Sequence, residues 1–126
     1  MGNLLRAVLS VMVVTMLSVP LHAWAHHSGA AYDYAHPVEV TGTVKEFIWA
    51  NPHCWIHLEV PNDQGGTDLW SLEGGGILGM VKAGWSNKVL QPGDKVRVLV
   101  APYRDGRKGG QFQSVADAKG KIWKLY

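Results

Sequence analysis

Histidines are the side chains of this sequence whose type and spacing most clearly suggest chemistry. Five of the six histidines lie between positions 26 and 57, and the 69 residues after position 57 contain none. Neutral imidazole is the commonest metal ligand among protein side chains, so the cluster indicates a metal site. Chance and barrel packing also produce short histidine clusters. The five residues are His26, His27, His36, His53 and His57.

The first two of these histidines depend on how the chain is processed. Residues 1–25 have the pattern of a secretory signal peptide, with Arg6 as a positive start, an uncharged apolar run over 7–19 and the small-x-small sequence Ala23-Trp24-Ala25. An apolar run of 13 residues is short for a bilayer core, which needs roughly 20 helical residues. We therefore expect cleavage rather than a membrane anchor, and a mature chain that begins at His26 in the periplasm.

A chain that begins at His26 carries a chelating group. Its free α-amino group and ring Nδ1 can hold one ion in a six-membered ring, and an imidazole from the folded domain would complete a three-nitrogen site. Nitrogen-rich tetragonal geometry favours copper(II), which also has the highest affinity in the divalent series. His27 offers a second mode through the terminal amine, a deprotonated amide and its own ring. The alternative is an arm that merely begins with two histidines.

His53 and His57 are predicted on the outward side of one strand, four residues apart. At roughly 3.3 Å per residue they are about 13 Å apart along the strand, so they cannot share one ion unless a bulge intervenes. His53, beside a predicted turn, is the expected copper partner of the amino-terminal arm. For His57 we favour a surface or cross-strand role opposite Lys45. Haem handling, with one histidine as axial ligand, is a further alternative.

An aromatic surface competes with the metal interpretation. If the strands that flank Asn51 pair as a hairpin, Phe47 lies opposite Trp55. Trp49 then lies opposite His53, and one face displays all these rings. Such a face would stack on a glycan, an aromatic small molecule or a partner protein. The competing interpretation is structural, with the amino-terminal arm folded over the face as a second small core.

Alternating apolar and polar residues predict the strands that position these side chains. Residues 26–37 are expected to form an extended arm and residues 38–126 a single domain. The predicted order of elements is three strands, a short helix and two more strands with a terminal hairpin. This is the order of an all-β, five-stranded oligonucleotide/oligosaccharide-binding (OB) barrel. A small antiparallel sandwich is the alternative. The strands are predicted over 38–48, 53–60, 67–73, 95–101, 111–116 and 122–126, and the helix over 77–83.

Charge and residue content narrow the function classes. Without residues 1–25, 11 Lys/Arg stand against 10 Asp/Glu, which leaves no electrostatic footprint for nucleic acid. The single cysteine, Cys54, excludes an internal disulfide and is expected to be buried. Glu73 and Asp94 are interpreted as solvated carboxylates, and the motifs of common hydrolases and phosphate-binding loops are absent. An enzyme is therefore not indicated.

Several motifs distributed over the mature chain resemble an uncharacterised family of small exported bacterial proteins, a domain of unknown function. They include His26-His27-Ser28, Asn51-Pro52-His53 and Pro92-Gly93-Asp94. The resemblance implies a periplasmic location and carries no activity.

Two hypotheses follow from the sequence. The leading one is a periplasmic protein that binds copper through His26, with His53 as partner. The second is a metal-free module that binds a glycan, a small molecule or a partner protein through Phe47, Trp49 and Trp55. Neither hypothesis includes nucleic acid or a membrane anchor after cleavage.

Overall fold

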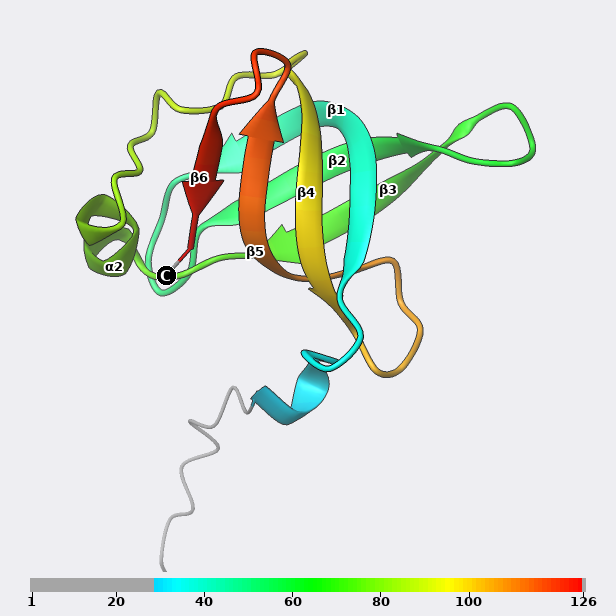
Figure 1. Ribbon diagram of the computed structural model, residues 1–126, viewed down its shortest axis with the longest axis horizontal. Helices are drawn as coiled ribbons and strands as arrows, with labels where there is room; N and C mark the ends of the chain where they lie inside the picture. Colours follow the sequence, from blue (N-terminus) through cyan, green and yellow to red (C-terminus); the bar gives the residue numbers. More distant parts are fainter. Residues whose placement is uncertain (1–28, 126) are drawn as a thin grey trace, which may run out of the picture.

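A computed structural model describes residues 29–125, and these residues form a closed β-barrel (Figure 1). The predicted signal peptide, His26 and His27 lie outside the described residues. Within residues 29–125, no helix is long and apolar enough to cross a membrane. The elements are a 3-10 helix at Gly29–Ala31, then β1 (Val38–Ile48), β2 (Trp55–Pro61), β3 (Thr67–Glu73), α2 (Ile77–Lys82), β4 (Lys95–Pro102), β5 (Gly109–Asp117) and β6 (Ile122–Lys124).

The strand order confirms the predicted barrel. The sheet runs β3-β2-β1-β4-β5-β6, and a parallel pairing of β3 with β5 closes the first five strands into a ring. The other pairings are antiparallel. The short helix lies between the third and fourth strands, as the sequence predicts. The small antiparallel sandwich is therefore excluded.

Element boundaries follow the predicted pattern closely, and the differences have local causes. β2 begins at Trp55 rather than at His53, because the Cys54 N–H bonds to the Gly75 carbonyl outside the strand ladder. β5 begins at Gly109, two residues earlier than predicted, because the parallel pairing recruits both glycines before Gln111. α2 ends one residue early, at Lys82.

A bulge in β1 overturns the predicted hairpin register. Val44 pairs with Leu58 and Glu46 pairs with His57, which leaves Lys45 as the extra residue. One inserted residue exchanges the two faces of everything that follows it in the strand. Phe47 therefore pairs with Ile56 and faces the core, whereas the sequence pattern placed it opposite Trp55. Ile48, predicted to face inward, instead pairs with Trp55 on the outer face.

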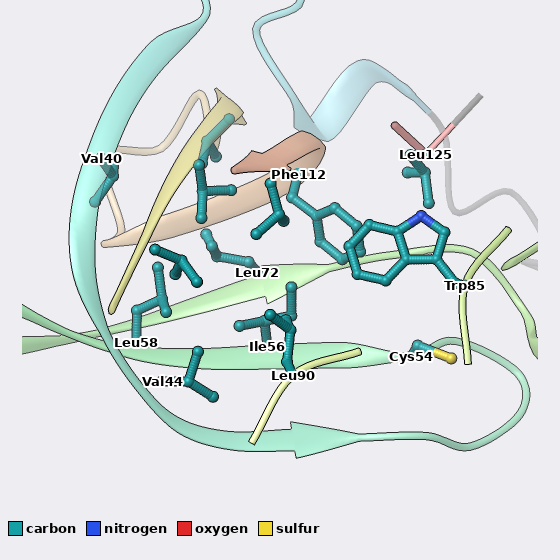
Figure 2. Close-up of a cluster of buried hydrophobic side chains, with 14 of the residues drawn as sticks. Val40, Val44, Cys54, Ile56, Leu58, Leu72, Trp85, Leu90, Phe112 and Leu125 are labelled. Atoms are coloured by element: carbon teal, nitrogen blue, oxygen red, sulfur yellow. The ribbon is translucent and has the colours of Figure 1, made fainter. Parts of the chain in front are cut away.

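The core surrounds Trp85 and Phe112, whose ring centroids lie 5.4 Å apart (Figure 2). The Trp85 Nε1–H donates to the Lys124 carbonyl at 2.8 Å, which satisfies the polar atom of a buried ring. Met80 of α2 is fully buried in the same cluster. Cys54 is buried as predicted, and burial raises the pKa of its thiol.

Candidate ligand-binding groove

A groove of about 480 Å³ lies over the outer face of β2 and β3. It exists there because side chains alternate along a strand: Ile56 and Leu58 are fully buried, so Trp55 and His57 point outward. The loop between β4 and β5 forms the other wall. The groove is lined by Ile48, Trp55, His57, Ser71, Tyr103, Arg107 and Lys108.

His57 and Ser71 form a polar pair on the floor of the groove. The two residues are cross-strand partners of β2 and β3, and His57 Nδ1 lies 3.1 Å from Ser71 Oγ. On its other side His57 pairs with Glu46, not with the predicted Lys45, because Lys45 occupies the bulge. The contact with Ser71 orients the His57 imidazole, and the pairing of β2 with β3 holds both residues in place.

The β4–β5 loop contributes a positioned arginine. The Arg107 Cζ atom lies 4.1 Å from the centroid of the Tyr103 ring, and its Nε–H donates to Asp105 Oδ2 at 2.7 Å. The pKa of Asp105 is lowered, chiefly by the hydrogen bond that its carboxylate accepts from the Arg107 backbone N–H. Burial is the main cause that raises the pKa of Tyr103, so its phenol stays neutral near pH 7. Arg107 is thus held by one ring and one carboxylate.

Lys108 is paired with an acid at the rim. Its Nζ contacts Asp68 Oδ2, and this hydrogen bond is the main cause that lowers the pKa of Asp68. The Asn62 amide also donates to Asp68, at 3.1 Å. The β4–β5 loop is therefore tied to β3 by this ion pair and by the adjoining strand pairing.

A buried carboxylate lies at one end of β3. Glu73 is only 5% exposed, whereas the sequence analysis interpreted it as a solvated residue. Tyr32 Oη donates to Glu73 Oε2, and His53 Nδ1 contacts Glu73 Oε1. The prediction was wrong because the segment before β1 covers the strand end: Tyr32 is buried, forms a β-bridge with Tyr103 and has its ring centroid 5.2 Å from that ring.

The described histidines are dispersed over different surroundings. His53 contacts Glu73, His57 bonds Ser71, and His36 is exposed beside Asp33 with a 3.0 Å Nδ1–Oδ2 distance. Within residues 29–125, no three His, Cys, Asp or Glu side chains are grouped to hold a metal ion. The predicted copper ligands His26 and His27 lie outside the described residues. That His53 is their partner in a copper site stays a prediction.

The aromatic residues do not share the predicted face. Phe47 packs against Trp49 and Trp85, with ring centroids 5.7 Å and 6.2 Å away, and both Phe47 and Trp49 border the hydrophobic core. Trp55 alone of the three predicted ligand residues lines the groove. The bulge explains the error. The sequence analysis did not assign Tyr103 and Arg107 to the site. The basic residues of the loop at 104–110 are the one local feature of the sequence that could have indicated Arg107.

Comparison with known proteins gives a family and no activity. A family model described as "Family of unknown function (DUF6152)" matches residues 13–113. No curated protein and no solved structure gives a significant match.

Proposed function

Since the chain belongs to the family of unknown function DUF6152, its role has to be argued from its site, and we propose that it is a binding protein whose groove over β2 and β3 holds a small ligand. The observation that carries the proposal is the composition of the groove, which combines Trp55, the His57–Ser71 pair and Arg107 in about 480 Å³. Small-molecule sites are concave and mostly apolar, with a few fixed polar groups, in the range of roughly 300–1,000 Å³.

The groove is also largely pre-formed. Trp55, His57 and Ser71 stand on paired strands, and Arg107 is held by Tyr103 and Asp105. A pre-organised site loses less conformational entropy when a ligand binds. The predicted signal peptide supports a periplasmic location for this binding activity.

The proposal is tested by titrating ¹⁵N-labelled protein with 2-naphthoate and with galacturonate, two ring-bearing probes. We expect amide shifts concentrated at residues 55–57, at Ser71 and in the loop at 103–108. Trp55→Ala should abolish them. Leu69→Ala, an exposed change on β3 outside the groove lining, should leave them intact. Shifts that persist in Trp55→Ala would overturn the proposal. It would also be overturned if neither these acids nor their neutral counterparts, 2-naphthalenemethanol and galactose, caused shifts.

Copper binding is a second candidate function, favoured by the contact between His53 and Glu73. A ligating histidine typically donates its other ring N–H to a carboxylate, which orients the ring and raises its basicity. Because Nδ1 of His53 lies against Glu73 Oε1, Nε2 is the ring nitrogen left to bind an ion. Tyr32 brings the arm to the same carboxylate, and the six residues back to His26 span at most about 20 Å. The proposed site joins the amine and ring of His26 to His53, with His27 as the alternative terminal mode.

The copper proposal is tested on the exported protein. Intact mass establishes whether the mature chain begins at His26, and Cu²⁺ titration against a competing chelator then gives the affinity. We expect His26→Ala to weaken binding by about 100-fold and His53→Ala by about 10-fold, since losing even a group that only orients a metal ligand costs about 10–100-fold in affinity. His36→Ala, at an exposed histidine, is the matched control. A different terminus, or unchanged affinity in His26→Ala, would refute this site.

A further inference from the structure

The charge of the groove indicates which class of ligand it holds. Both ionised side chains in its lining, Arg107 and Lys108, are cationic, and none of its described lining residues is a carboxylate. The chain as a whole is nearly neutral outside residues 1–25. Each cation is paired with an acid outside the lining, Arg107 with Asp105 and Lys108 with Asp68. The groups that face the groove are nevertheless cationic and include no carboxylate, which favours an anionic ligand.

Arg107 is the better placed of the two cations. Within the described residues, the hydrogen bonds of its side chain go to Asp105, which accepts from Nε. The Tyr103 ring lies against its guanidinium at 4.1 Å. These two contacts restrain the guanidinium plane and leave the two Nη groups as the donors that can meet an anion. The planar fork of arginine matches a carboxylate with two parallel hydrogen bonds. Lys108, in contrast, is already paired with Asp68.

Trp55 is the ring against which the rest of the ligand can stack. Tyr103 is less suited, because Arg107 and Tyr32 both pack against its ring. Trp55 is half-buried on the outer face, with Ile48 as its apolar cross-strand neighbour. Aromatic rings stack on the flat apolar faces of sugars and of other aromatic groups. His57 and Ser71 lie two residues further along the strands and can bond to ring substituents.

From these positions we infer that the ligand is a small carboxylic acid carried on a flat ring, with its carboxylate on Arg107 and its ring on Trp55. The inference rests on the proposed binding function and names its ligand class. An aromatic acid and a sugar acid share this chemistry. Trp55 would bind the ring of the ligand by stacking, and Arg107 would bind its carboxylate through two parallel hydrogen bonds.

Paired probes that differ in charge test the inference. Affinities are measured by calorimetry for 2-naphthoate against 2-naphthalenemethanol, and for galacturonate against galactose. At least one acid should bind about tenfold or more tightly than its neutral partner, as a charge-assisted contact predicts. The pair with the larger preference identifies the source, aromatic acid or sugar acid.

Two arginine variants distinguish recognition by Arg107 from a general effect of the protein's positive charge. Arg107 is 66% exposed, so Arg107→Gln should fold normally and remove the preference for the acid. Arg97→Gln, an exposed change on β4 beside Glu39, should retain it. Equal affinities for acid and neutral probe, or a preference that survives Arg107→Gln, would overturn the ligand class while the binding proposal stands. If none of the four probes binds, both proposals fail.

Discussion

At the scale of single residues, Tyr32 and Glu73 join the amino-terminal segment to the barrel. A carboxylate that is only 5% exposed is costly unless its oxygens accept hydrogen bonds. Tyr32 Oη donates such a bond to Glu73 Oε2, and His53 Nδ1 contacts Oε1. Because Tyr32 also packs on Tyr103, which supports Arg107, the segment before β1 and the groove share one set of contacts.

This contact leads to a stability prediction. Tyr32→Phe removes the hydroxyl donor to the Glu73 carboxylate and should lower the free energy of unfolding by about 1.5–3 kcal/mol, the range for hydrogen bonds to charged groups. Urea unfolding measures the change. Tyr34→Phe is the control, since the Tyr34 hydroxyl bonds Gln111 in an exposed position, and surface changes usually stay within about 0.5 kcal/mol. Equal effects of the two substitutions would contradict the assigned role of Tyr32.

At the scale of elements, the link from β3 to α2 passes close to the core. A Cβ on Gly74 would lie 2.7 Å from two atoms of the Phe112 ring, and the Gly74 N–H donates to the Cys54 carbonyl at 2.8 Å. A side chain at position 74 therefore requires the Phe112 ring or the backbone to move. In α2, by contrast, a Cβ on Gly79 would meet no atom within 4 Å.

These two glycines give a matched pair of substitutions. Gly74→Ala should lower the free energy of unfolding by about 1–3 kcal/mol, because the buried Phe112 ring has to move. Gly79→Ala should raise it by about 0.5–1 kcal/mol, since alanine is the better helix former. Thermal or urea unfolding of both variants checks the opposite signs. A neutral Gly74→Ala would show that the link can relax away from Phe112.

At the scale of the whole molecule, two glycines allow the barrel to close. Gly109 and Gly110 have φ values of 143° and 152°, and a Cβ on Gly110 would lie 2.1 Å from the Ala101 carbonyl oxygen. They form the start of the parallel pairing with β3. Ring closure therefore requires a backbone conformation and a close approach that only glycine permits.

This role in closure predicts that alanine at one glycine lowers the free energy of unfolding strongly and at a nearby glycine only slightly. Gly110→Ala should cost about 3 kcal/mol or more, from backbone strain combined with the clash. Gly106→Ala, in the β4–β5 loop with φ 81° and open space around it, should cost only about 1–2 kcal/mol. Chemical unfolding and hydrogen exchange at the β3–β5 pairing check the difference. Similar costs at both sites would argue against a special role of Gly110 in closure.

Some residues of the candidate site could be placed from the sequence, and others could not. Trp55 and His57 were assigned to the outward face of one strand because alternation is a local property of two neighbouring residues. Phe47 and Trp49 were misplaced because no residue type marks the bulge at Lys45. Glu73 was misjudged because a carboxylate at a strand end is usually solvated. Its burial depends on Tyr32, which is 41 positions away in the chain.

The sequence by itself determined the strands, the short helix and their order, and that order was enough to predict the five-stranded barrel. These features depend on side-chain periodicity and on glycine and proline signals within a few residues. The tertiary structure alone decided which face Phe47 and Ile48 occupy, that Glu73 is covered, and that Arg107 lies across the groove from Trp55. The physical reason is that bulges, burial and ion pairs are set by packing between segments distant in the chain, where no local pattern records the partner.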